Sequence, residues 1–239
     1  FMRIIFAILG FVVLIFPACG PSGKYPAPSS DTRIAELLGR MTPVEKFRQL
    51  FMVPGSLELG ADKLAPGIFG LQIGAAGADG DPAGQMLKPG AGGSAFETAV
   101  KVNEIQRFFK EKSRLGIPII PFEEALHGLT HPGATAFPQA IGLAATFDTG
   151  LMRQVAAAIA REAKTRGIRQ ILSPVINIAD DVRWGRTEET YGEDPFLSAE
   201  MGTAFVSEFE KTGVIATPKH LLANVGAGGR DSYPIHDDE

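Results

Sequence analysis

Hydrophobic positions along the chain alternate between short apolar runs and longer segments with helical spacing. The apolar runs predict four buried strands, at residues 67–73, 117–122, 168–178 and 214–217. The segments with helical spacing predict three helices, at residues 94–114, 149–166 and 196–212, the last two ended by Gly167 and Gly213. Apolar strands that alternate with helices predict an α/β fold with a parallel sheet covered on both faces.

Two short helices are predicted before the first of these strands. Asp31 can cap a helix that runs through Leu38. Residues 42–45 read Thr-Pro-Val-Glu, a capping box with proline at the first helical position, and they predict a second helix through Leu50 and Phe51. Ser94-Ala-Phe-Glu repeats the capping-box pattern where the first long helix begins.

The N-terminal segment has the pattern of an export signal. Arg3 precedes thirteen apolar residues, 4–16, and the sequence Pro-Ala-Cys-Gly follows at 17–20. This resembles a bacterial lipoprotein signal, in which the cysteine, here Cys19, is lipidated. The alternative is a membrane-spanning anchor, but thirteen residues fall short of the ~20 that cross a bilayer. We expect a signal peptide at residues 1–19, a Pro- and Ser-rich linker at 20–30 and one domain at 31–239.

Composition argues against several kinds of partner. The chain has 23 Lys and Arg against 27 Asp and Glu, and no basic stripe, so we expect no nucleic-acid partner. Its single Cys excludes an intrachain disulfide framework. The histidines lack the spaced His and acid partners of a zinc site, so no metal is expected. Residues 74–93 are glycine-rich but lack a phosphate-loop ending or a dinucleotide fingerprint, and we expect no cofactor.

Polar clusters follow the predicted strands. Glu-Glu-Ala-Leu-His-Gly occupies residues 123–128, a run rich in Arg and acids with the only Trp occupies 177–195, and Lys-His occupies 219–220. In a (β/α) barrel the loops after the strands open at one end, so these segments should converge. Acids and cations that converge there suit a sugar ring, whose hydroxyls both donate and accept hydrogen bonds.

Each candidate residue also has a structural explanation. Glu124 would otherwise be a surface acid, and Trp184 is either part of the loop core or an apolar platform for a sugar. We expect one of Arg183 and Arg186 to hold the loop through ion pairs with its carboxylates. Lys219 and His220 can both reach one ligand only where the strand ends or twists, because adjacent residues of a regular strand face opposite sides.

Taken together and in order, these motifs resemble the N-terminal domain of glycoside hydrolase family 3, which contains β-glucosidases and β-xylosidases. The matching segments are residues 117–128 with Glu-Ala-Leu-His-Gly, 137–148, Trp-Gly-Arg at 184–186 with Tyr-Gly-Glu-Asp-Pro at 191–195, and Pro-Lys-His at 218–220. The resemblance implies an incomplete TIM-barrel-like (β/α)8 domain, about the first half of the barrel. It also implies a retaining β-glycosidase that acts on β-glucosides or related oligosaccharides.

The resemblance assigns roles to individual residues. Glu124, Arg186, Lys219 and His220 match residues that bind the sugar in the innermost subsite. The family's nucleophile is an aspartate on a later strand, and its acid/base is in most branches a glutamate on a second domain, so we expect no catalytic residue in this fragment. One branch uses the His of an Asp-Ser-His triplet, but residues 231–233 read Asp-Ser-Tyr. The rival interpretation is a non-catalytic carbohydrate-binding lipoprotein, which sequence beyond residue 239 would discriminate.

Overall fold

The computed structural model describes residues 32–55, 57–74, 93–129, 131–221 and 224. The chain forms two units, Phe1–Arg40 and Met41–Glu239. The described part of the first unit is helix α1, Thr32–Arg40, which has no buried residue. It matches the predicted first helix, whereas its expected cap, Asp31, lies outside the described residues. Among the described helices, none is both long enough and apolar enough to cross a membrane.

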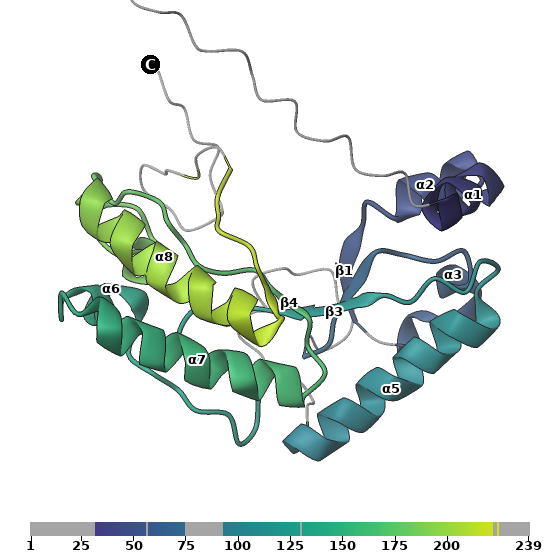
Figure 1. The fold of residues 1–239 in the computed structure, drawn as a ribbon, viewed down its shortest axis with the longest axis horizontal. Helices are drawn as coiled ribbons and strands as arrows, with labels where there is room; N and C mark the ends of the chain where they lie inside the picture. The colour runs from purple at the N-terminus through teal and green to yellow at the C-terminus, as the bar shows by residue number, and fades with distance from the viewer. Residues whose placement is uncertain (1–31, 56, 75–92, 130, 222–223, 225–239) are drawn as a thin grey trace, which may run out of the picture. The chain divides into compact units, whose positions relative to one another are not determined.

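The second unit is built on a parallel sheet. In the described ranges, five strands lie side by side in chain order: β1 (Met52–Pro54), β2 (Gly70–Gln72), β3 (Ile120–Glu123), β4 (Gln170–Ile171) and β5 (Ile215–Ala216). Gly70 pairs with Met52 on one side and with Ile120 on the other, and Gln170 pairs with Phe122 and Ile215. A parallel sheet whose order follows the chain is a TIM-barrel-like arrangement, here a partial barrel, and it confirms the predicted fold class (Figure 1).

Helices connect successive strands of this sheet. They are α5 (Ala95–Lys112), α6 (Ala140–Ala144), α7 (Thr149–Thr165) and α8 (Pro195–Thr212). Right-handed crossovers between strands that advance in one direction place every connecting helix on the same face. Figure 1 shows α5 and α7 on one side of the strands. The sequence predicts a sheet covered on both faces, and in a partial barrel the face opposite these helices is the inside of the barrel.

Local signals placed most helix ends correctly. Thr42 and Ser94 both form complete capping boxes, with Glu45 and Glu97, and Gly213 ends α8 in the left-handed conformation. Helix α2 (Pro43–Arg48) is shorter than predicted, because the chain turns after Arg48 and enters β1.

The sequence prediction missed several short elements. They are β1, α6, α3 (Ala61–Leu64) and the 3-10 turns η1 (Leu57–Leu59) and η2 (Thr187–Glu189). Elements of three to five residues carry too little periodicity to be recognised. β1 also contains a proline, which argues against a strand in sequence-based prediction.

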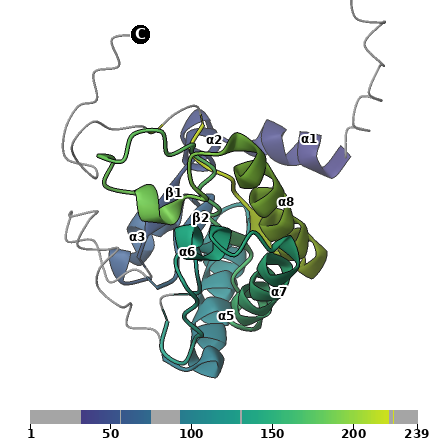
Figure 2. The ribbon, with the colours of Figure 1, turned by 90° about the vertical axis from the view of Figure 1, so that its left-hand side faces the viewer.

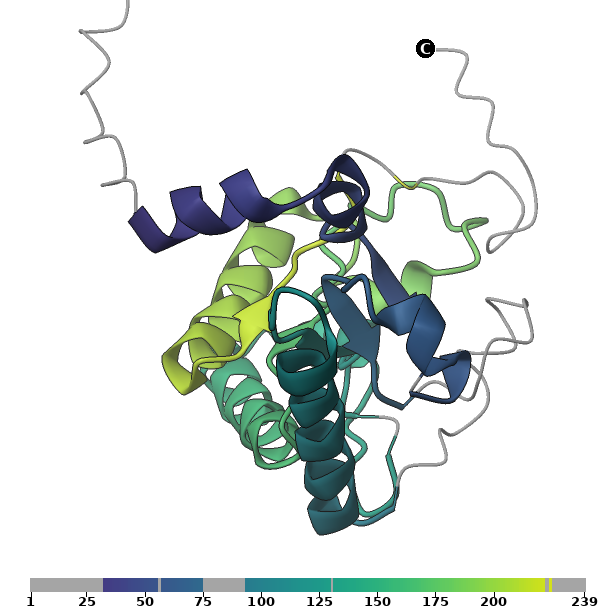
Figure 3. The ribbon, with the colours of Figure 1, turned by 90° about the vertical axis from the view of Figure 1, so that its right-hand side faces the viewer.

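Two apolar clusters hold the helices to the strands. Helix α5 packs Ile105 and Phe109 against Leu71 of β2. Helices α7 and α8 lie side by side (Figures 2 and 3) and bury Ile159 and Phe205 in the second cluster, which includes Ile171 of β4. Fully burying a side chain of this size contributes about 1.5–3 kcal/mol, so these clusters are what presses the helices onto one face of the sheet.

An ion pair between buried Glu45 and half-exposed Arg114 joins α2 to the turn after α5. Glu45 is only 6 % exposed and accepts a hydrogen bond of 2.6 Å from Nε of Arg114, with a second bond from Nη2. These bonds lower the pKa of Glu45 to about 2. Since Arg114 precedes β3, this pair lies at the end of the strand opposite to Glu123 and Glu124.

Candidate functional site

The segments after β3 and β5 meet at the carboxyl ends of their strands. Nζ of Lys219 donates a hydrogen bond of 2.8 Å to Oε1 of Glu124, although 95 residues separate them in the sequence. Both side chains are largely buried, with 15 % of Lys219 and 23 % of Glu124 exposed. The parallel sheet thus brings together two of the four residues predicted to bind a sugar.

The backbone beyond β5 explains how the neighbouring residue, His220, also reaches this region. β5 ends at Ala216, and Lys219 then forms an isolated bridge with Val175. Its N–H donates to the carbonyl oxygen of Pro174 at 2.9 Å. Lys219 and His220 therefore lie past the regular strand, which is the condition under which neighbouring side chains need not alternate.

His220 is held by Asn177, the first residue of the charged run. The backbone N–H of His220 donates to Oδ1 of Asn177 at 3.2 Å, and Nδ1 of the imidazole lies 2.8 Å from the same oxygen. The peptide bond between Lys219 and His220 is cis. Asn177 is 8 % exposed, and we did not single it out from the sequence because only its partner across 43 residues reveals its role.

The environment of Glu124 leaves one of its oxygens without a hydrogen-bond partner. Burial raises the pKa of its carboxyl group, and the charge of Lys219 opposes that rise. Glu189 raises the pKa further and Arg186 lowers it, so four charged side chains act on one another here. Oε2 of Glu124 is buried and has no hydrogen-bond partner among the described residues. A buried acceptor without a partner costs about 1–3 kcal/mol, which a ligand hydroxyl would recover.

Arg186 is buried and bound through both arms of its guanidinium group. Its Nε and Nη2 donate to the two carboxylate oxygens of Glu189 at 2.9 and 2.7 Å. The side chains are 7 % and 5 % exposed. The turn η2 brings the two residues together. The sequence places several acids in this loop and does not indicate that Glu189 is the partner of Arg186.

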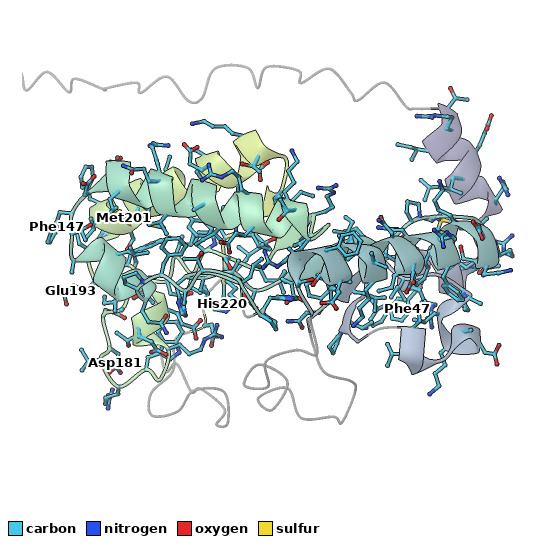
Figure 4. The ribbon with its side chains drawn as sticks, turned by 90° about the horizontal axis from the view of Figure 1, so that it is seen from below. Phe47, Phe147, Asp181, Glu193, Met201 and His220 are labelled. Atoms are coloured by element: carbon cyan, nitrogen blue, oxygen red, sulfur yellow. The ribbon has the colours of Figure 1, made fainter. Side chains whose placement is uncertain are left out.

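The other arginine of this loop is paired at the surface. Arg183 donates to Asp181 at 2.7 Å, its side chain is 71 % exposed, and it lowers the pKa of Asp181 to about 2. Figure 4 shows Asp181 at the outside of its loop, away from His220. The sequence predicts that one of the two arginines holds the loop through ion pairs with its carboxylates. In the structure both arginines are paired in this way, so the prediction was wrong on this point.

Trp184 belongs to the core of the loop. It is 4 % exposed, and its indole Nε1 is buried without a hydrogen-bond partner in the described ranges. Of the two alternatives for this residue, the structure therefore supports loop core over an open sugar platform. Tyr191 is also buried, and burial raises the pKa of its hydroxyl group.

His127, from the motif after β3, contacts the backbone of its own loop. Nδ1 of His127 lies 2.9 Å from the carbonyl oxygen of Phe137, which holds the loop after β3. In the part of the chain that the structure describes, no three His, Cys, Asp or Glu side chains gather as metal ligands do. Cys19 and residues 231–233 lie outside the described residues.

Comparison with known proteins assigns the family. The family model of the glycosyl hydrolase family 3 N-terminal domain matches residues 81–238, which is more than half of the chain. The chain belongs to glycosyl hydrolase family 3. The resemblance that the motifs indicated is thereby confirmed.

Individual relatives of this family 3 chain are longer proteins. A β-xylosidase of Formosa agariphila is 39 % identical over 136 residues, covering 51 % of this chain and 19 % of the relative. A periplasmic β-glucosidase of Salmonella typhimurium is 28 % identical over 221 residues, covering 88 % and 26 %. The solved structure of a β-glucosidase from Erythrobacter marinus is similar with a TM-score of 0.63 and 30 % identity, covering 79 % and 25 %. The chain spans about a quarter or less of the length of these proteins.

Proposed function

We propose that the complete protein is a retaining β-glycosidase that hydrolyses β-glucosides, β-xylosides or related oligosaccharides. In this proposal the chain supplies the side chains that hold the innermost sugar ring, namely Glu124, Arg186, Lys219 and His220. The observation that carries the proposal is the unpartnered Oε2 of Glu124 beside Lys219 at the carboxyl ends of parallel strands. Family membership and the names of the similar proteins support the same reaction class.

The chemistry of a pyranose fits this arrangement. A sugar hydroxyl would donate to Oε2 of Glu124, and the Lys219 ammonium group would donate to the oxygen of a hydroxyl. Hydrogen bonds to charged groups contribute about 1.5–3 kcal/mol each. A ring held in this way would also give Oε2 of Glu124 a hydrogen-bond partner. Glu124 and Lys219 already constrain each other at 2.8 Å before a ligand binds.

The residues that break the glycosidic bond are proposed to lie beyond residue 239. Retaining hydrolysis requires a nucleophilic carboxylate that attacks the anomeric carbon and an acid/base that protonates the leaving oxygen, with the two carboxyl groups about 5–5.5 Å apart. The covalent glycosyl-enzyme is then hydrolysed by water, activated by the second group acting as a base. Glu124 is assigned to binding, because its near carboxylate oxygen is already bonded to Lys219. Glu189 is assigned to holding Arg186.

Turnover of aryl β-glucosides and β-xylosides tests this proposal. The complete protein should hydrolyse at least one of the two, and residues 31–239 alone should not. Comparable turnover by residues 31–239 would place the catalytic carboxylates inside this chain. A complete protein that binds glucose or xylose without turnover would instead support the carbohydrate-binding lipoprotein.

We further propose that the protein is exported and anchored to a bacterial membrane by a lipid on Cys19. The basic residue, apolar run and cysteine of residues 3–20 support this, as does the periplasmic relative from Salmonella typhimurium. In cells fed a labelled fatty acid, the wild type should carry label and partition with membranes. The Cys19→Ala variant should carry none, and equal labelling of the two proteins would contradict the anchor.

A further inference from the structure

A second buried acid, Glu123, immediately precedes Glu124 and contacts a different set of residues. Glu123 is 6 % exposed, and its Oε1 accepts a hydrogen bond from the backbone N–H of Gly74, just past β2. Nε2 of His131 lies 3.3 Å from the same oxygen, and the His131 side chain is 1 % exposed. Glu123 is the last residue of β3 and Glu124 follows it, and the two carboxylates bond to different partners, Gly74 and Lys219.

The backbone on both sides of Glu124 is tied to a neighbouring strand. On one side, the carboxylate of Glu123 accepts from the N–H of Gly74, two residues past the end of β2. On the other side, the N–H of Ala125 donates to Oγ of Ser173 at 3.1 Å, and Ser173 beyond β4 is fully buried. Glu124 is thus the middle residue of a tripeptide whose flanks are attached to the strands on its left and right in the sheet.

The contact between Glu123, His131 and Gly74 has no spare room. A Cβ atom at Gly74 would come within 2.7 Å of both Oε1 of Glu123 and Nε2 of His131, so a larger residue there would displace one of these side chains. Neither nitrogen of His131 has a hydrogen-bond partner among the described residues. The imidazole is therefore held against the carboxylate by packing, with its Nε2 3.3 Å from Oε1 of Glu123. A buried carboxylate is costly without hydrogen-bond donors, and here the donors are the N–H of Gly74 and, at 3.5 Å, Nε2 of Gln72.

We propose that Glu123, backed by His131, is a positioning residue that fixes the carboxylate of Glu124 toward the sugar. This inference rests on the proposed function, since it assigns Glu124 to binding. Loss of the bond between Glu123 and Gly74 leaves only backbone bonds, such as Ile73 N–H to the carbonyl oxygen of Phe122, to hold the end of β3 to the segment after β2, and the ring then binds to a less ordered carboxylate. Because the ring is held in both the ground state and the transition state, the loss should raise KM more than it lowers kcat.

Kinetics of Glu123 variants in the complete protein test this role. Glu123→Ala should raise KM for an aryl β-glucoside and the inhibition constant of glucose by about 10-fold, while kcat changes by less than about 3-fold. Glu123→Gln should restore both constants to within about 3-fold of wild type, because its amide oxygen still accepts from Gly74. Glu45→Ala is the matched control, since Glu45 is equally buried but lies on α2, where it pairs with Arg114 ahead of β3. It should lower Tm and leave KM unchanged.

A second variant keeps the inference testable if Glu123→Ala does not fold. Ser173→Ala removes one oxygen from the opposite flank and should raise KM by about 3-fold with kcat unchanged. If the wild type is active and KM is unchanged in Glu123→Ala, this inference alone is overturned. If Glu123→Ala is unfolded, an unchanged KM in Ser173→Ala overturns it instead. A rise in KM that Glu45→Ala reproduces also overturns it. A wild type that neither hydrolyses aryl β-glycosides nor binds glucose or xylose overturns the proposed function and this inference with it.

Discussion

Replacing Lys219 by alanine in the complete protein is expected to lower kcat/KM for an aryl β-glycoside by about 10² or more. The substitution removes the donor that lies 2.8 Å from Oε1 of Glu124 and leaves a largely buried carboxylate without it. The proposed sugar ring also loses the only ammonium group that the described structure brings to Glu124.

The same substitution should change the pH dependence of the reaction. Burial already raises the pKa of Glu124, and Lys219 is the largest influence that opposes it. Without Lys219 the pKa rises further, so Glu124 takes up its proton at a higher pH on acidification. The acid side of the kcat/KM profile should therefore move to higher pH in the variant.

Lys211→Ala is the matched control for Lys219→Ala. Lys211 also donates to a glutamate, Glu208, at 2.7 Å, but its side chain is 65 % exposed on α8. An exposed pair of this kind contributes little, so both kcat/KM and the pH profile should stay at wild-type values. Near-normal kinetics in Lys219→Ala would contradict the proposed pocket.

Arg186→Ala is the second substitution with a large expected effect. It should lower kcat/KM by about 10² or more and lower the free energy of unfolding by about 3–5 kcal/mol. The physical reason is that Glu189, only 5 % exposed, loses both hydrogen bonds from the guanidinium fork and keeps a buried charge. Arg186→Lys should recover little, because an ammonium group cannot bond both carboxylate oxygens in the same geometry.

Arg183→Ala gives the comparison within the same loop. Arg183 makes a similar pair with Asp181, but at the surface, where water replaces the lost partner. Its stability and kinetics should resemble wild type. Steady-state kinetics and denaturant unfolding of the three variants decide the matter: an Arg186→Ala protein that behaves like Arg183→Ala would contradict a binding role for Arg186.

Much of the fold could be predicted because its signals are local. The capping boxes at Thr42 and Ser94 and the left-handed glycine at Gly213 each involve residues within a few positions of one another. The long helices followed from these signals and from apolar spacing. Strand β1 could not be found in the same way, since three residues become a strand only by pairing with β2.

The candidate site could be predicted only as a set of residues. Loops after parallel strands open at one edge, which was enough to group Glu124 with Lys219 and with the charged run. Which side chain meets which depends on packing over long sequence separations. The structure decided that Trp184 is buried in the loop core and that Arg186 pairs with Glu189. The anchoring of His220 by Asn177 also emerged only there.

By itself, the sequence determined the α/β class, the long helices, the family and the residues that gather after the strands, because these depend on periodicity, caps and motif order. Only the tertiary structure decided the unpartnered oxygen of Glu124 and the contact of Glu123 with Gly74 and His131. Those features arise when strands far apart in the chain end at one edge of the sheet. Burial then sets which polar atoms are paired and which remain available to a ligand.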